Sequence, residues 1–394
     1  MPSTSGPDAL LSECRELQAE LRRHPTLASL HGDAGWPELA ARLSRLLGTV
    51  RRHAPASPSL SAAGLPCEPP RPAAPLRAVH WNIEKALRFD RIREALLTRP
   101  ELRGADLVLL NEVDLGMARS GNRDVAAELS DALGLHAAWA PMFLETTAGR
   151  AEDRALAAGT GNREGLLGLA VLARWPLGQA RVVELPSPQR HQFEAERMYG
   201  RHVALAVEVL RPGAPLVAVS THLEVHRGRA ERARQARALL DAVRAEARPV
   251  VLAGDFNSHT FDRGRAFEPL RAGLALLLAP EASLRGRFLH PDRGAHRETL
   301  FDELRAAGFA WATFTDRAPT LRLRFERVGE ARALTRLAGP LLARARARME
   351  RRAALRLDWF AARGFPRGAG RTAAGLDGPE GASDHAPIAA EFLE

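Results

Sequence analysis

The sequence predicts a mixed fold of the α/β or α+β class, preceded by a helical extension. Short apolar runs of strand length recur from residue 77 onward, and most of them end in polar clusters. Segments with apolar residues at helical spacing separate several of these runs, whereas other runs follow one another directly. Strands joined both by helices and by short turns form mixed sheets, so a purely parallel doubly wound sheet is not expected.

The beginning of the chain predicts the helical extension. Apolar residues recur at helical spacing over residues 8–23 and again over 36–50. The following segment, 54–75, is rich in Pro and Ala and has no periodicity, which is typical of an extended linker. We therefore expect a helical extension at 1–53, a linker at 54–75 and the main domain at 76–394.

The main domain contains a series of candidate strands. They are the runs AVHWNIE, ADLVLLNEVD, LLGLAVLAR, HVALAVEV, LVAVSTHLE, VVLAGDFN, LDWFAARG and APIAAEF. Helices are expected over residues 86–98, 122–134, 227–247 and 298–308. The stretch 145–164 has weak periodicity and is expected to be a mobile loop.

Composition excludes a chain that is disordered throughout, because 45% of the 394 residues are hydrophobic and 26% are charged. The formal net charge is +9, and only one of the 56 cationic residues is a lysine, Lys85. Asparagine is also scarce, so each of the five asparagines is less easily explained by chance. Cys14 and Cys67 stand at no zinc-site spacing, and the first thirty residues carry acidic groups where a signal peptide is apolar. We therefore expect a cytoplasmic protein that is stabilised by its hydrophobic core.

Carboxylates, amides and imidazoles stand where the candidate strands end. They are Asn82, Glu84, Glu112, His222, Asp255, Asn257, Asp384 and His385. Each has an ordinary explanation when taken singly, because Asp and Asn stabilise turns and a lone His commonly packs in a core. Together they indicate a site of oxygen ligands with two imidazoles, which suits Mg²⁺ or Mn²⁺ and phosphate better than zinc.

Six sequence blocks make a family resemblance specific. They are HWNIE at 80–84, LLNEVD at 109–114, STHLE at 220–224, LAGDFNS at 252–258, LDWFAARG at 357–364 and SDHAPI at 383–388. Their order and spacing resemble the endonuclease/exonuclease/phosphatase superfamily, which has the DNase I-like fold, over residues 77–393. The resemblance implies a four-layer sandwich of two mixed β-sheets packed face to face with helices outside. It also implies hydrolysis of phosphoesters with a divalent metal, Mg²⁺ or Mn²⁺.

The resemblance assigns the metal site to four of these residues. It implies that Glu112 is the central ligand, with Asn82, Glu84 and Asp384 close to the ion. This set suits Mg²⁺, which needs one or two carboxylates and keeps its other positions for water and substrate phosphate.

The resemblance also implies the catalytic residues. Asp255 orients or deprotonates the attacking water, and Asn257 holds that water or a phosphate oxygen in line. His385 pairs with a separate carboxylate, for which Asp358 is the matching candidate, and His222 donates to the scissile phosphate or the leaving group. Which imidazole is the general acid, and which is the base or an electrostatic stabiliser, stays open.

Two polar positions have structural alternatives. Glu84 is equally well explained as a surface carboxylate that pairs with Lys85 or Arg88. Asn122 follows the Glu112 strand in a loop that rims the substrate cleft in the family, but a helix N-cap is its favoured role. Asn111 alternates away from Glu112 on the same strand and is expected to be structural.

The segment 317–356 departs from the family pattern, in which a short hairpin joins the ATFTD-type strand to the LDW-type strand. It contains twelve arginines and three glutamates, a surplus of nine positive charges. Its helical leucine stripe is interrupted near Gly339 and Pro340, which predicts two helices or one kinked helix. Such a basic insertion either holds a polyanionic substrate near the metal or covers a sheet edge as a solvated helix pair. An anionic membrane is a less favoured partner, since the stripe contains few large aromatics.

The favoured function is a divalent-metal-dependent phosphodiesterase that acts on nucleic acid, as an endo- or exonuclease. Hydrolysis of phospholipid head groups or small phosphate esters is the alternative, because the fold alone does not choose the substrate. A catalytically inactive binding module is least favoured, since every matched catalytic position is filled.

Overall fold

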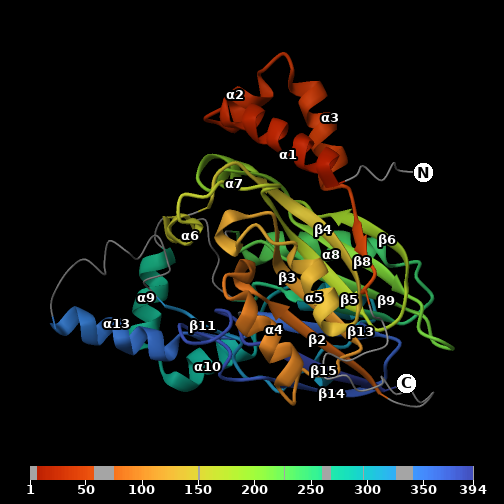
Figure 1. The fold of residues 1–394 in the computed structure, drawn as a ribbon. Helices are drawn as coiled ribbons and strands as arrows, with labels where there is room; N and C mark the ends of the chain where they lie inside the picture. The colour runs from red at the N-terminus through yellow and green to blue at the C-terminus, as the bar shows by residue number, and fades with distance from the viewer. Residues whose placement is uncertain are drawn as a thin grey trace.

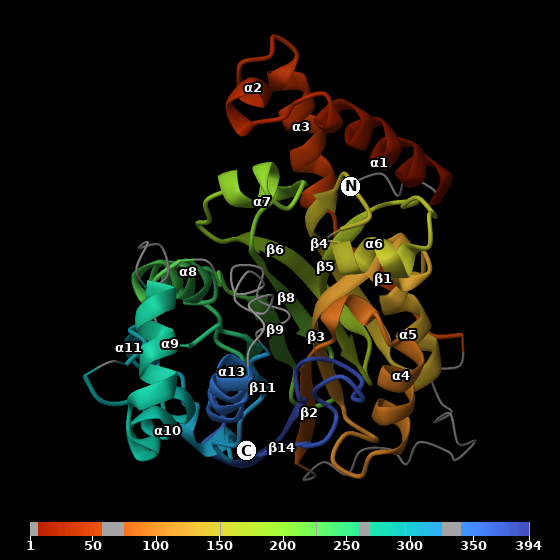
Figure 2. The same cartoon turned by 90° about the vertical axis from the view of Figure 1, so that its left-hand side faces the viewer.

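The computed structural model describes residues 7–56, 75–149, 151–225, 227–259, 268–295, 297–324 and 340–393. Two mixed sheets lie face to face between outer helices, as Figure 1 and Figure 2 show. In Figure 2 the layers run from α4 and α5, through the two sheets, to α8 and α11. The four-layer sandwich implied by the resemblance is therefore confirmed.

The first sheet has eight strands in the order β1-β4-β5-β3-β2-β15-β14, with β7 also paired to β4. The strands are β1 (Arg51–His53), β2 (Leu76–Asn82), β3 (Leu107–Leu115), β4 (His136–Glu145), β5 (Leu166–Ala173), β7 (Met198–Gly200), β14 (Arg367–Thr372) and β15 (Ile388–Leu393). Only β2 and β3 are parallel neighbours in this sheet, and helix α4 (Phe89–Thr98) provides the crossover between them.

The second sheet has five strands in the order β13-β10-β9-β8-β6. They are β6 (Leu177–Glu184), β8 (Val203–Val209), β9 (Leu216–His222), β10 (Val250–Asp255) and β13 (Asp358–Arg363). β9 and β10 are parallel and are joined by helix α8 (Arg229–Ala242). In both sheets, the carboxyl ends of a parallel pair lie together at one edge.

Strand β5 shows why these runs are apolar at nearly every position. All eight of its residues are buried. Leu169 and Val171 face the core between the sheets, whereas Ala170 and Leu172 face the core under the outer helices. Both faces of the sheet are covered, so alternation of polar and apolar residues gives way to a continuous apolar run.

The outer helices cover the sheets with separate cores. Helices α4 and α5 (Val125–Leu133) pack on the first sheet, and α8 and α11 (Leu300–Ala306) pack on the second. The helix expected over 86–98 begins only at Phe89, because Glu84, Lys85 and Ala86 all have positive φ angles. Helix α5 begins at Val125, where the Asp124 side chain accepts a hydrogen bond from Ala127 N–H.

The extension contains helices α1 (Pro7–Arg22), α2 (Leu27–His31) and α3 (Trp36–Leu47). The expected second helix, 36–50, therefore ends earlier, and residues 51–53 form strand β1 instead of helix. Buried residues of α1 and α3 belong to the same core as the outer face of the first sheet. Most of the expected linker, residues 57–74, lies outside the described residues.

Two short helices lie in connections where none was expected. The segment 145–164 contains the short helix α6 (Ala151–Ala157), whose Asp153 forms ion pairs with Lys85 and Arg119. These pairs depend on residues far away in the sequence, so weak local periodicity did not reveal them. Another short helix, α7 (Arg190–Glu194), precedes β7.

The basic insertion forms the short strands β11 (Leu321–Arg322) and β12 (Ala354–Leu355) and helix α13 (Pro340–Arg352). Helix α13 packs on α9 (Glu268–Leu278) and α10 (Glu281–Leu289) through a small apolar cluster that includes Met349. The described part thus covers these helices, and residues 325–339 lie outside the described residues. No described helix is both long enough and apolar enough to span a membrane.

Candidate active site

Strand pairing brings three of the expected catalytic residues into one row. Asp255 on β10 lies opposite His222 on parallel β9 and opposite Asp358 on antiparallel β13. Paired residues of neighbouring strands point to the same face of a sheet, so the three side chains lie side by side. The His222 Nε2 atom is 3.5 Å from Asp255 Oδ2.

His385 joins this row from the segment before β15. Its Nδ1 is 2.7 Å from Asp358 Oδ2, and its Nε2 is 3.7 Å from Asp255 Oδ2. Burial alone would lower the pKa of His385, but the charges of Asp358 and Asp255 raise it well above its ordinary value. Burial alone would raise the pKa of Asp358, but His385 lowers it. The pair is therefore an imidazolium and a carboxylate at neutral pH.

A second imidazole, which was not among the expected site residues, lies within hydrogen-bond distance of the other oxygen of Asp358. His80 is fully buried, with Nε2 at 3.1 Å from Asp358 Oδ1 and Nδ1 at 3.1 Å from the Leu109 carbonyl oxygen. Alternation on strand β2 was the available signal, because His80 and Asn82 are two residues apart and lie on the same face.

Asp255 is the centre of the cluster. It is 2% exposed; its Oδ2 accepts a hydrogen bond from Asn82 Nδ2 at 3.3 Å, and its Oδ1 accepts one from Asn257 N–H at 2.9 Å. Its backbone N–H donates to Asn111 Oδ1 at 2.9 Å. Asn111 also donates to the Ser220 hydroxyl at 3.2 Å, so it connects the two sheets directly behind the site.

Glu112 is presented by a local distortion of β3. The pairing of β3 with β5 shifts between Leu110 and Val113, and Glu112 has a φ of 56°. A bulge with a left-handed residue re-aims one side chain within a strand, and such strain commonly occurs at functional sites. Burial alone would raise the pKa of Glu112, but His222, Lys85 and a 3.1 Å hydrogen bond from Asn82 lower it.

The donors near Asn82 fit a hard divalent cation. Asn82 Nδ2 donates to carboxylate oxygens of Glu112 at 3.1 Å and of Asp255 at 3.3 Å, whereas Asn82 Oδ1 accepts from Glu84 N–H. The two carboxylates therefore offer the hard oxygen ligands that Mg²⁺ and Mn²⁺ prefer, and the Asn82 amide would add its oxygen after a half-turn of its side chain.

A second arrangement has metal-ligating atoms from Asp255, Asp358 and His385 within 4.8 Å of one another. In that arrangement the contact between His385 and Asp358 is already a 2.7 Å hydrogen bond with a proton in it. The Glu112 side therefore fits a cation better.

His222 differs from His385 in its electrostatic state. Burial lowers the pKa of His222, although Asp255 and Glu112 oppose this effect. Its Nδ1 is buried and has no hydrogen-bond partner among the described residues. The backbone carbonyl of His222 accepts a hydrogen bond from His202 Nδ1 at 2.8 Å. At neutral pH His222 is therefore the neutral imidazole beside Asp255 and His385 the charged one.

The remaining expected residues lie less centrally. Glu84 forms an ion pair with Arg88 at 3.1 Å, which is the structural alternative for this carboxylate. Asp384 is partly exposed and its charge contributes to the raised pKa of His385. Asn257 has a φ of 47° and donates from Nδ2 to the Leu223 carbonyl at 2.8 Å.

The loop after β3 differs from its expected role. Asn122 is not the N-cap of α5, because Asp124 caps that helix. Asn122 instead has a φ of 55° and bridges to the segment before β5, where its Oδ1 accepts from Arg163 N–H. Arg119 is buried and pairs with Asp114 and Glu145, so it does not rim a cleft.

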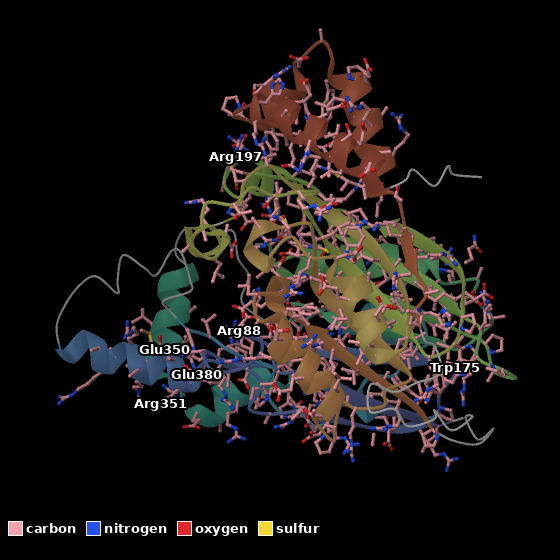
Figure 3. The ribbon with its side chains drawn as sticks, viewed as in Figure 1. Arg88, Trp175, Arg197, Glu350, Arg351 and Glu380 are labelled. Atoms are coloured by element: carbon pink, nitrogen blue, oxygen red, sulfur yellow. The ribbon has the colours of Figure 1, made fainter. Side chains whose placement is uncertain are left out.

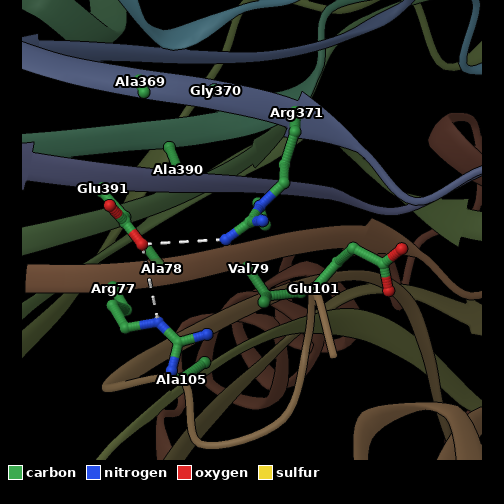
Figure 4. A pocket seen from close by; sticks show the side chains of 11 residues that line it. Arg77, Ala78, Val79, Glu101, Ala105, Ala369, Gly370, Arg371, Ala390 and Glu391 are labelled. Atoms are coloured by element: carbon green, nitrogen blue, oxygen red, sulfur yellow. Dashed lines mark ion pairs between the residues drawn. The ribbon is translucent and has the colours of Figure 1, made fainter. Parts of the chain in front are cut away.

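A groove of about 400 Å³ lies away from these residues, against β2, β14 and β15. Its floor is formed by small side chains, and Glu391 lies between Arg77 and Arg371 (Figure 4). None of the catalytic candidates lines it, so the groove is not the active site.

One protein family and several solved structures are similar to this chain. A model of the Endonuclease/Exonuclease/phosphatase family matches residues 79–385, and no curated protein matches the chain. An endonuclease/exonuclease/phosphatase from Beutenbergia cavernae is 21% identical, with a TM-score of 0.46 over 81% of this chain and 72% of that chain. Truncated Caenorhabditis elegans TDP2 is 14% identical, with a TM-score of 0.44 over 81% and 98%.

The 3′ phosphatase NExo from Neisseria, solved with a product DNA hairpin, is 16% identical to this chain. Its TM-score is 0.46 over 81% of this chain and 100% of that chain. The family match covers most of the chain and spans both sheets. The chain therefore belongs to the endonuclease/exonuclease/phosphatase family of metal-dependent hydrolases that act on phosphoester bonds.

Proposed function

We propose that the protein is a Mg²⁺- or Mn²⁺-dependent phosphodiesterase that cleaves nucleic acid. The observation that carries the hydrolytic part is the convergence of Asp255, His222 and the Asp358–His385 pair beside Glu112 and Asn82. Mg²⁺ held by Glu112 and Asn82 would neutralise charge on the phosphoryl oxygens. Glu84 and Asp384 remain candidate outer ligands.

The roles of the side chains follow from their charge states. Asp255 orients the attacking water and accepts its proton, while Asn257 helps to hold that water in line with the phosphorus atom. The His385 imidazolium directs its Nε2–H toward the phosphoryl group, because Nδ1 is occupied by Asp358. Neutral His222 contributes a hydrogen bond from Nε2 to the phosphate or the leaving oxygen.

The preference for nucleic acid is supported by the arginines of α13. Arg344, Arg348 and Arg351 are exposed and recur at spacings of four and three residues, so they share one face of the helix. Arg351 lies at the rim of the molecule in Figure 3. It is seven residues before Asp358, so their Cα atoms are at most about 25 Å apart. A nucleic-acid strand bound at the site therefore needs to extend by no more than about 25 Å to reach Arg351.

A phospholipid head group is the second candidate substrate. Leu274 and Leu278 on α9 are 48% and 77% exposed, and Arg348 donates to the Leu277 carbonyl beside them. Exposed leucines next to guanidinium groups suit the surface of an anionic bilayer.

One assay tests both the reaction and the substrate. Purified protein with Mg²⁺ or Mn²⁺ is incubated with single- and double-stranded DNA, RNA, anionic phospholipid vesicles and bis-p-nitrophenyl phosphate. We expect cleavage of nucleic acid that chelator abolishes and that Glu112→Ala lowers by about 100-fold or more. Glu391→Ala removes a carboxylate in the groove of Figure 4 and is the matched control. Turnover that survives both chelator and Glu112→Ala would contradict the mechanism, and cleavage of lipid alone would select the second substrate.

A further inference from the structure

Lys85 lies beside the metal-site candidates and is the only lysine in a chain with 56 cationic residues. It follows Glu84 in the turn after β2, and its side chain is 22% exposed. Its ammonium group pairs with Asp153 on α6 at 3.0 Å. We propose that Lys85 binds a phosphate oxygen of the substrate next to Glu112, which presupposes that this site cleaves a phosphoester.

The backbone at Lys85 is held in an unfavourable conformation. Glu84, Lys85 and Ala86 have φ angles of 47°, 60° and 57°, and left-handed conformations cost energy for residues with a Cβ atom. The turn is fixed by Glu84 N–H, which donates to Asn82 Oδ1 at 3.1 Å, and by Ile83 N–H, which donates to the Asn111 carbonyl at 3.1 Å. Strain of this kind persists where it places a functional group, and here it places Lys85 beside the catalytic strands.

Lys85 shares its carboxylate partner with a second cation. Asp153 is shared, because Arg119 also lies 3.6 Å from the same Asp153 oxygen. Arg119 is itself held by Asp114 and Glu145. The positive charge of Lys85 reaches Glu112, where it helps to lower the pKa of that carboxylate.

The ammonium group suits this position for a geometric reason. It carries three N–H donors that point in different directions, and the hydrogen bond to Asp153 uses one of them. A guanidinium has a planar fork that binds one carboxylate with two parallel bonds, as Arg119 does with Asp114. An ammonium can hold Asp153 with one hydrogen and a phosphate oxygen with another.

The simpler explanation is a structural clamp, in which Lys85 only fastens α6 to the turn after β2. Two substitutions separate the explanations, because Asp153→Asn removes the ion pair and leaves the ammonium, whereas Lys85→Met removes both. If Lys85 is only a structural clamp, the two substitutions should lower activity equally. A phosphate-binding residue requires a much larger loss of activity in Lys85→Met.

The kinetic test uses bis-p-nitrophenyl phosphate and Mg²⁺. We expect Lys85→Met to lower kcat/KM by about 10- to 100-fold, as for loss of a hydrogen bond from a charged donor. Asp153→Asn should stay within about threefold of the unmodified protein, with urea unfolding as the check on folding. Equal losses in both variants, or no loss in Lys85→Met, would overturn the proposal. Loss of activity in Glu112→Ala shows separately that the hydrolytic part of the proposed function holds.

A direct test exploits the single lysine. Expression with ¹³C-labelled lysine gives the signals of this one side chain and leaves all three of its N–H donors in place. We expect added inorganic phosphate to shift this lysine signal until it saturates. The lysine signal of Glu391→Ala should shift in the same way. A lysine signal that does not move, while phosphate inhibits hydrolysis, would refute binding at Lys85 and leave the proposed function intact.

Discussion

Asp358 shows how a buried carboxylate is kept ionised in this site. It is 1% exposed, and each of its oxygens faces a different imidazole, His385 on one side and His80 on the other. Its backbone N–H also donates to Thr320 Oγ1 at 3.2 Å. A buried charge is tolerated only when its hydrogen-bonding capacity is filled. His80 and Thr320 fix the position of Asp358, and Asp358 in turn orients His385.

Replacement of His80 should disturb the site through Asp358. His80→Phe keeps an aromatic ring but leaves Asp358 Oδ1 and the Leu109 carbonyl without this partner. We expect a loss of about 1–3 kcal/mol in the free energy of unfolding, together with a fall in kcat that exceeds the change in KM. Urea unfolding and steady-state kinetics measure the two effects. A variant with unchanged kcat would show that His80 does not position Asp358.

Asp292 should make stability depend on acid pH. Burial alone would raise its pKa, but Arg317, at 2.5 Å, and the Trp311 indole N–H, at 3.0 Å, lower it below the ordinary 3.8. A lowered folded-state pKa adds stability above pH 3.8 that is lost as the pH falls through the folded-state value. Asp292→Asn should therefore be less stable at pH 7, by about 1–3 kcal/mol. The difference should shrink below pH 3.8.

Urea unfolding at several pH values measures this difference. Asp241→Asn is the control, because Asp241 is exposed and pairs with neighbouring Arg244 on the surface. If the unmodified protein and Asp292→Asn differ in free energy of unfolding by the same amount at every pH, the lowered pKa of Asp292 is contradicted.

Helix α13 is attached to its neighbour by both apolar and polar contacts. Arg352 donates to the Leu276 carbonyl at 2.6 Å and to the Leu277 carbonyl at 3.0 Å, at the carboxyl end of α9. A cation at this end of a helix satisfies carbonyl groups that have no partner within the helix. Arg352 therefore has a structural role, which leaves the exposed arginines of α13 as the candidates for substrate binding.

The exposed arginines of α13 should account for part of the salt dependence of binding. We expect Arg344→Ala with Arg351→Ala to weaken binding of short DNA and to reduce the slope of log K against log salt by about two. Fluorescence anisotropy with Glu112→Ala protein avoids cleavage during the measurement. Arg103→Ala with Arg367→Ala removes the same charge from exposed positions outside α13. Equal slopes in the two double variants would assign the effect to net charge instead of α13.

The helical extension shares a hydrophobic core with the first sheet and its outer helices. Leu17 of α1 and Leu43 of α3 belong to the same core as Val79 of β2 and Leu129 of α5. Gln18 adds a hydrogen bond from its side chain to the Glu164 carbonyl at 2.9 Å. The extension is therefore part of the outer layer of the first sheet.

Truncation within this shared core should destabilise the whole protein. Leu17 is fully buried, so Leu17→Ala should lower the free energy of unfolding by about 2–5 kcal/mol. We expect one cooperative transition, followed by far-ultraviolet circular dichroism and tryptophan fluorescence in parallel. Leu156→Ala on α6 removes an exposed leucine and should have little effect. Transitions that do not coincide in the two signals would mean that the extension unfolds separately.

Much of the candidate site could be anticipated because its residues lie at strand ends within short motifs. Asp255 and His222 follow apolar runs directly, and their meeting needs only that β9 and β10 be parallel neighbours. The bulge that presents Glu112 could not be anticipated, since it arises from a register shift between β3 and β5. Asn122 was assigned to the wrong helix position for a similar reason, because its partners lie in the segment before β5.

Local periodicity was sufficient for the fold class, and the six motifs in their order were sufficient for the family, because these features are written in neighbouring residues. The layer arrangement came only from the family resemblance. The partners of individual side chains required the folded chain. His80 and Asp358 are 278 positions apart, and Lys85 and Asp153 are 68 apart. Contacts over such separations depend on strand register and sheet packing, which no local pattern encodes. The tertiary structure therefore decided which imidazole holds which carboxylate, and which cation stands beside Glu112.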